Sequence, residues 1–124
     1  MLENSVKVCE ILKQNNINSA LISMHTIKPI DKELIMDIAN SYNFIITIEE
    51  HNVIGGLGSI VGDIILENNL PLKLKKFAIP DKYTCKGGSQ EHLRACYNIG
   101  VDQIVKEILD KVKLRKKHPN LIVF

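Results

Sequence analysis

The segment with the most potential for chemistry is TIEEHNVIGGLGS, which spans residues 47–59. It places two adjacent carboxylates, Glu49 and Glu50, beside His51, and three glycines follow. A carboxylate next to an imidazole could act as an acid and base pair. A glycine-rich turn that opens a helix could hold phosphate oxygens. The same pattern is also typical of a strand–loop–helix junction that has no chemistry of its own.

The glycines fit neither of the common phosphate-binding fingerprints. A dinucleotide site needs G-x-G-x-x-G directly after a strand. Here Gly56 and Gly58 are followed by Val61 at the third glycine position, and Gly62 comes one residue late. A Walker A loop needs a lysine that this segment lacks. We therefore interpret Gly55 and Gly56 as a turn and Gly58 as a point of close helix packing.

The two glutamates are predicted to diverge. Neighbouring residues of a strand point to opposite faces of its sheet, so Glu49 and Glu50 do not form a carboxylate dyad. Both lie at the carboxyl end of a predicted parallel strand, where open α/β sheets place their ligand crevice. One glutamate is expected to face that crevice, and the other a helix layer or a partner. Helix capping or a bridge to another subunit is the structural alternative.

Two histidines and two serines raise further alternatives. His25 follows the first predicted strand, so His25, His51 and Glu50 could together bind a metal such as zinc. Nothing in their spacing fixes such a site, and hydrogen-bonded surface histidines are the plainer interpretation. Ser59 and Ser89 lie outside a G-x-S-x-G nucleophile motif. We interpret both serines as helix N-caps.

These residues are carried by alternating helices and strands. Apolar periodicity predicts helices over 3–14, 32–41, 60–67, 90–97 and 102–114, and strands over 19–24, 44–50 and 72–79. Asp31 is the predicted N-cap of the second helix. This order predicts an α/β fold of three layers, α/β/α, with a mostly parallel sheet. Three strands are few for such a sheet and the chain opens on a helix, so a first strand is expected to be missing or to come from elsewhere. Residues 120–124 are a candidate edge strand, in this molecule or a neighbour.

Composition narrows the class of protein. The chain has 124 residues, enough for one domain, and a net charge of +2 that gives no argument for nucleic acid or a membrane surface. Cys9, Cys85 and Cys96 lack C-x-x-C spacing and are expected to be buried free thiols in a reducing cytoplasm. No apolar run approaches the length of a membrane span, and no signal-peptide pattern opens the chain. The basic run over 111–117 is interpreted as a solvated helix end.

Four segments together resemble one enzyme family. They are MHTIKPID (24–31), TIEEHNVIGGLGS (47–59), IPDKY (79–83) and GGSQEHL (87–93). Over roughly residues 5–112 their order and spacing resemble the C-terminal domain of transketolase-like, thiamine-diphosphate-dependent enzymes. That family includes deoxyxylulose-phosphate synthase and the beta subunits of 2-oxo acid dehydrogenases. The first two segments are most similar to split transketolases, whose C-terminal half is a separate polypeptide.

The resemblance implies a module without catalytic groups. In that family, thiamine diphosphate and a divalent metal bind on other domains through a Gly-Asp-Gly motif, which is absent from this chain. The family fold has a five-stranded sheet with one antiparallel strand. The resemblance therefore implies a domain over residues 1–114 without its first strand, followed by a basic and apolar tail over 115–124. Its role would be packing and subunit assembly in an enzyme that transfers ketol units between sugar phosphates.

No catalytic, cofactor-binding or metal-binding residue is predicted in the chain itself. The residues expected near contacts with partner domains are His25, Glu49, Glu50, His51, Gly55 and Gly56. The expected partners are the catalytic, thiamine-binding domains or subunit of the same enzyme, and further copies of this chain. One alternative is the C-terminal domain of a deoxyxylulose-phosphate synthase-like enzyme. The other is a free-standing module that holds a small anion at a helix N-terminus near His25, His51 and Gly55.

Overall fold

The predicted helices and strands are all present in the computed structural model, which describes residues 1–83, 87–113 and 120–124. The helices are α1 (Leu2–Gln14), α2 (Lys32–Ile38), α3 (Leu57–Glu67), α4 (Gln90–Cys96) and α5 (Val101–Lys113). The strands are β1 (Ser19–Leu21), β2 (Phe44–Asn52), β3 (Lys73–Ile79) and β4 (Leu121–Val123). Only the ends differ from prediction: β1 and α2 are shorter, and α3 begins earlier, at the glycine turn.

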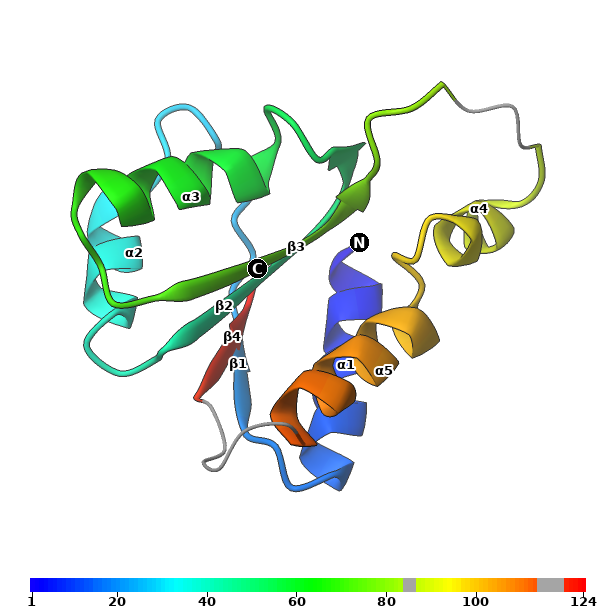
Figure 1. Cartoon of the computed structure of the whole chain (residues 1–124), viewed down its shortest axis with the longest axis horizontal. Coiled ribbons are helices and arrows are strands. Elements are labelled where there is room, and N and C mark those ends of the chain that lie inside the picture. Colours follow the sequence, from blue (N-terminus) through cyan, green and yellow to red (C-terminus); the bar gives the residue numbers. More distant parts are fainter. Residues whose placement is uncertain (84–86, 114–119) are drawn as a thin grey trace.

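The sheet separates two layers of helices, so the predicted α/β/α architecture is confirmed. α1 and α5 cover one face, and α2 and α3 cover the other (Figure 1). Within the described residues the sheet has four strands in the order β1-β4-β2-β3, and every pair is parallel. The antiparallel strand that the resemblance implied is not found among them.

The C-terminal strand lies inside the sheet, so its predicted edge position is wrong. Ile122 pairs with Ala20 of β1 on one side and with Ile45 of β2 on the other. The carboxyl end of β4 lies at the same end of the sheet as the first residues of α1 (Figure 1). β4 therefore occupies the place that a strand leading into α1 would take. A purely apolar segment suits this position, because both of its faces are covered by helices.

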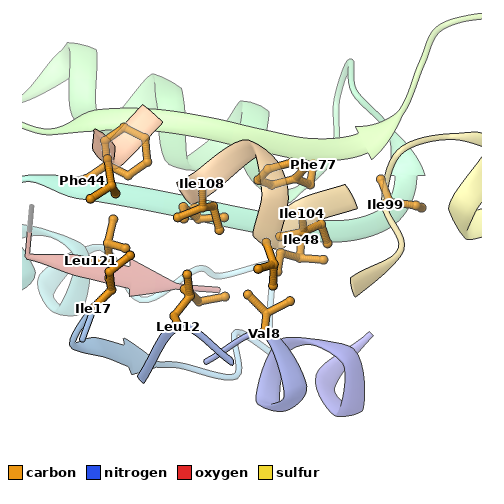
Figure 2. Packing of buried hydrophobic residues seen from close by; sticks show 14 residues of the cluster. Val8, Leu12, Ile17, Phe44, Ile48, Phe77, Ile99, Ile104, Ile108 and Leu121 are labelled. Carbon is orange, nitrogen blue, oxygen red and sulfur yellow. The ribbon is translucent and has the colours of Figure 1, made fainter. Parts of the chain in front are cut away.

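Two hydrophobic cores lie on the two faces of the sheet. The first is formed by α1, α5 and the side chains of β2, β3 and β4 that face them. It includes Val8, Leu12, Ile104, Ile108 and Leu121 (Figure 2). The second lies under α2 and α3 and includes Ile35, Ile45, Val61, Ile64 and Ile122. β4 and the start of β2, residues 44–46, are apolar throughout because successive residues enter opposite cores.

The helix starts follow local signals. The Asp31 carboxylate accepts a hydrogen bond from the Leu34 amide at 2.9 Å, and the Ser89 hydroxyl accepts one from the His92 amide at 3.3 Å. The predicted N-caps Asp31 and Ser89 are therefore confirmed. No helix in the described part of the chain is long and apolar enough to cross a membrane. Cys9 and Cys96 are free and only half-buried, whereas Cys85 lies outside the described residues.

We predict that Ile122→Ala lowers the free energy of unfolding by about 2–5 kcal/mol, because it leaves a cavity in the middle of the sheet. Ile122 is 1% exposed. Urea unfolding followed by circular dichroism measures the change. Leu66→Ala is the matched control, since Leu66 lies on the surface of α3 and its loss should change the same quantity by less than about 0.5 kcal/mol. Equal effects in the two variants would contradict the central placement of β4.

Candidate functional site

The candidate site is the carboxyl edge of the sheet, where the loops after β1, β2 and β3 emerge. Its centre is the end of β2, with His51, and the loop between β2 and α3, which contains Gly55 and Gly56. Asn52 joins this loop to the segment after β3, because its side-chain amide donates to the Asp81 carboxylate at 2.9 Å. The Asn52 side-chain oxygen also accepts from the Ile54 amide at 2.8 Å. The edge is thus held by polar bonds between loops that are distant in sequence.

Glu49 is a buried carboxylate that caps α3. One of its oxygens accepts from the Leu57 amide at 2.7 Å, and the other accepts from the Gly58 amide at 2.8 Å. These amides belong to the first turn of α3, where backbone N–H groups have no partner inside the helix. The positive end of the helix dipole and the two hydrogen bonds compensate for burying the charge. Of the two alternatives for this glutamate, the structure selects helix capping.

The glycines shape the loop around that carboxylate. A Cβ atom on Gly56 would lie 2.0 Å from a Glu49 carboxylate oxygen, so only glycine lets the backbone pass there. A Cβ atom on Gly58 would lie 2.6 Å from the Thr47 hydroxyl, which confirms close packing of the helix start on β2. Gly55 has a φ of +80°, a conformation that favours glycine. The turn interpretation therefore holds for Gly55, whereas Gly56 is required for space.

This arrangement leaves no anion site at the start of α3. Glu49 takes the Leu57 and Gly58 amides, and the Ser59 and Ile60 amides donate to the Gly56 carbonyl at 3.0 and 3.2 Å. A diphosphate would meet a fixed carboxylate where it needs free donors. The residues at this loop therefore do not fit thiamine diphosphate, and the proposed anion site near His25, His51 and Gly55 does not form at this helix.

Glu50 points away from Glu49 and holds α4. One of its oxygens accepts from the Arg94 Nε at 2.8 Å, and both oxygens lie within 3.2 Å of the Gln90 side-chain nitrogen. The predicted divergence of the two glutamates is confirmed, since Glu49 bonds to α3 and Glu50 to α4. The hydrogen bond from Arg94 lowers the pKa of Glu50 below its usual value, despite partial burial. Arg94 and Gln90 were not found by sequence reasoning, because no local pattern pairs them with β2.

His25 and His51 do not form a metal site. Nδ1 of His25 lies 3.3 Å from the Ser23 carbonyl oxygen, and Nδ1 of His51 lies 3.0 Å from the Asn52 carbonyl oxygen. Both rings are exposed and bonded to their own loops. No group of three or more histidine, cysteine or acidic side chains gathers anywhere in residues 1–83, 87–113 and 120–124. The surface interpretation of the histidines is therefore supported over a zinc site.

Ser59 lies next to a lysine but is not arranged as a nucleophile. The Lys76 ammonium donates to its hydroxyl at 3.2 Å, and the Gly55 amide donates to the same oxygen at 3.0 Å. The hydroxyl itself donates to the Val53 carbonyl at 3.1 Å. All bonding positions of the hydroxyl are thus used to fix the loop. Gly56 is the N-cap of α3, so the predicted capping role of Ser59 is wrong.

Three exposed apolar side chains stand on loops at the carboxyl edge. Ile27 follows β1, Ile54 follows β2 and Tyr83 follows β3, with exposed fractions of 42%, 65% and 105%. Sequence reasoning missed them, because an apolar residue in a loop gives no signal until its exposure is known. Single exposed apolar residues are common on proteins. These three side chains follow successive strands of the parallel sheet, so all three lie on loops at its carboxyl edge.

The cavity beside Glu50 is small. It has a volume of about 230 Å³ and lies between the ends of β2 and β3 and α4, with Leu93 and Tyr97 among its walls. Its polar rim includes Lys82 and the side chains that already bond to Glu50. Cavities that bind small molecules usually measure about 300–1,000 Å³. A second, wider hollow of about 500 Å³ lies at the same edge and is lined by Asn52, Asp81, Lys82 and Tyr83.

Comparison with known proteins is consistent with this geometry. The family described as "Transketolase, C-terminal domain" matches residues 1–104. The chain is 38% identical over 109 residues to a provisionally named transketolase C-terminal section of Methanocaldococcus jannaschii, covering 88% of this chain and 33% of that protein. It is 36% identical over 117 residues to a 1-deoxy-D-xylulose-5-phosphate synthase of Dehalococcoides mccartyi, covering 91% of this chain and 18% of that one.

One solved structure matches the whole architecture. It is described as a split gene transketolase in an inactive beta4 tetramer, with a TM-score of 0.75 and 27% identity. The match covers 92% of this chain and 36% of that one. The chain thus spans about a third or less of the length of these relatives.

We predict that Glu49→Gln lowers the free energy of unfolding by about 1–3 kcal/mol, because the new NH2 group faces an amide that donated to the carboxylate. Hydrogen exchange at the Leu57 and Gly58 amides should accelerate as well. The matched control is Glu33→Gln, which removes an exposed carboxylate from the first turn of α2. If both variants behave alike, Glu49 does not support the glycine loop.

The Glu50–Arg94 ion pair predicts a dependence of stability on pH. Because the folded-state pKa of Glu50 is lowered, its contribution is present above the unfolded pKa and is lost as pH falls through the folded pKa. The stability difference between the wild type and Glu50→Gln should therefore shrink between about pH 5 and pH 3. Glu91→Gln, on the same helix as Arg94, serves as the control. Urea unfolding at each pH measures this difference. A stability difference between the wild type and Glu50→Gln that stays constant with pH would rule out the ion pair.

Proposed function

The chain belongs to the transketolase C-terminal domain family, and we propose that it is the non-catalytic C-terminal module of a transketolase-like enzyme. In the assembled enzyme, other domains would carry thiamine diphosphate and its divalent metal, and would transfer ketol units between sugar phosphates. The cofactor supplies that chemistry when it is bound. This chain would supply a folded surface on which the catalytic domains or subunit assemble.

The observation that carries this proposal is a contrast at the carboxyl edge between the occupied N-terminus of α3 and the exposed apolar side chains on the loops around it. The helix N-terminus at this edge, where α/β proteins often bind anions, is filled by the protein's own Glu49. Around it, Ile27, Ile54 and Tyr83 present apolar surface to the outside. Exposed apolar and aromatic side chains are typical of the surfaces that proteins bury on association. The edge thus has the properties of a docking surface.

The six residues expected at contacts take two different roles in this proposal. His25, Glu50, His51 and Gly55 are exposed on the edge and would form part of its polar rim. Glu49 and Gly56 are buried beneath it and would hold the loop in shape. A partner would therefore contact the surface of the loop and would not contact the buried Glu49 carboxylate.

Two of the relatives support a partnership between separate polypeptides. The protein from Methanocaldococcus jannaschii is named as a C-terminal section, and the solved relative is described as a split gene product that is an inactive tetramer. By analogy, we propose that this chain associates with a thiamine-binding partner and with further copies of itself. A role in a 1-deoxy-D-xylulose-5-phosphate synthase-like enzyme is the second candidate, favoured by similarity over 91% of the chain.

The proposal predicts that this chain forms a stable complex with the thiamine-binding polypeptide encoded by the same genome, measured by analytical ultracentrifugation and calorimetry. Ile54→Asp and Tyr83→Ala should each weaken that complex about tenfold or more, because both side chains are exposed at the docking surface. Leu66→Asp is the control. It lies at the far end of α3, away from the carboxyl edge, and should leave affinity unchanged.

Two outcomes would count against this function. One is the absence of any complex while inorganic phosphate raises the melting temperature of the chain, which would favour a free-standing anion-binding module. The other is a complex that Leu66→Asp weakens as much as Ile54→Asp does. In that case the docking surface would not be the carboxyl edge.

A further inference from the structure

The groove that holds β4 has the properties of a peptide-binding site. β1 and β2 form its two sides. On one side the Ile22 amide donates to the Val123 carbonyl at 2.8 Å, and on the other the Phe124 amide donates to the Ile46 carbonyl at 2.7 Å. The Ile48 amide then donates to the Phe124 carbonyl at 2.9 Å. Domains that bind extended peptides by strand addition use this combination of main-chain bonds and alternating side-chain pockets.

The side chains of the segment fill pockets on both faces of the sheet. Leu121 and Val123 enter the core under α1 and α5, and Ile122 and Phe124 enter the core under α2 and α3. All four are at most 5% exposed. The Asn120 side-chain amide fixes the start of the segment by donating to the Ser41 carbonyl at 3.1 Å. Five consecutive residues are thus recognised like a ligand.

β4 makes few of its contacts with the element that precedes it in the chain. Its pairing partners are β1 and β2, whereas α5 packs mainly on α1. The match to the family ends at residue 104, so the groove lies within the matched residues and β4 lies beyond them. The contacts that hold β4 would be identical if the segment came from another molecule of the same sequence.

We infer that a second copy of this chain can donate its β4 to the groove between β1 and β2, which gives a reciprocal, strand-exchanged dimer. Each copy then gives and receives the same segment, so the assembly closes with two-fold symmetry. The chain's own β4 competes with the β4 of a second copy for this groove, and its effective concentration is about the millimolar range. Because the groove is closed on both sides once the sheet has formed, exchange requires folding at high protein concentration.

This inference is independent of the proposed function, because it concerns the interior of the sheet and not the carboxyl edge. It is tested on the full chain with Cys9, Cys85 and Cys96 replaced by serine. Ala20→Cys is introduced in one preparation and Ile122→Cys in a second preparation that carries a longer tag. These two positions face each other across adjacent strands, a spacing that a disulfide can span. The preparations are unfolded together in urea, refolded at high concentration and oxidised.

The expected result is a covalent dimer of one untagged and one tagged chain on a non-reducing gel. The pair Leu21→Cys and Val123→Cys, on the opposite face, should give the same product if the first pair folds poorly. Ala20→Cys mixed with Leu66→Cys is the control for random collisions, because Leu66 is on the surface of α3. The inference is overturned if neither facing pair exceeds this control, while a single chain carrying both cysteines of a facing pair closes its own disulfide.

Discussion

The sheet is continuous only because β4 lies between β1 and β2. In the described residues β1 pairs with no other strand, so the order β1-β4-β2-β3 would break in two without the C-terminal segment. The same three-residue strand sends alternate side chains into both cores. It therefore joins the α1–α5 layer to the α2–α3 layer. Together with β2, which also contributes side chains to both cores, β4 holds the two layers of helices on one sheet.

A second constraint acts at the carboxyl edge, where a charge had to be buried. Glu49 stabilises the first turn of α3, and this is possible only because Gly56 leaves room for the carboxylate and Gly58 lets the helix start pack on β2. The loop that results has no free helix amides to offer a ligand. Ile54 is exposed on this loop, and Ile27 and Tyr83 are exposed on the loops that follow β1 and β3. The same burial that closes the anion site thus fixes the loop that carries Ile54.

Sequence patterns predicted most of the fold and part of the site. Period located the helices and strands along the chain, and capping residues placed the starts of α2 and α4, because these signals act within a few residues, as Asp31 and Ser89 show. The start of α3 was missed, since its N-cap is Gly56 and not Ser59. Strand geometry also predicted that Glu49 and Glu50 diverge. The partners of these glutamates could not be predicted. Arg94 on α4 bonds to Glu50, and Lys76 on β3 bonds to Ser59. These partners are far apart in the sequence, so no local sequence pattern predicts the pairs.

The sequence by itself determined the alternation of helices and strands, the parallel sheet and the resemblance to transketolase C-terminal domains. The tertiary structure alone decided three things: that residues 121–123 fill the middle of the sheet, that Glu49 is a cap and not a reacting group, and that Ile27, Ile54 and Tyr83 are exposed on loops at the carboxyl edge. The physical reason is the range of the interactions. Helix and strand preferences are set by neighbouring residues, whereas strand order, burial and the pairing of charges depend on contacts between segments that only the folded chain brings together.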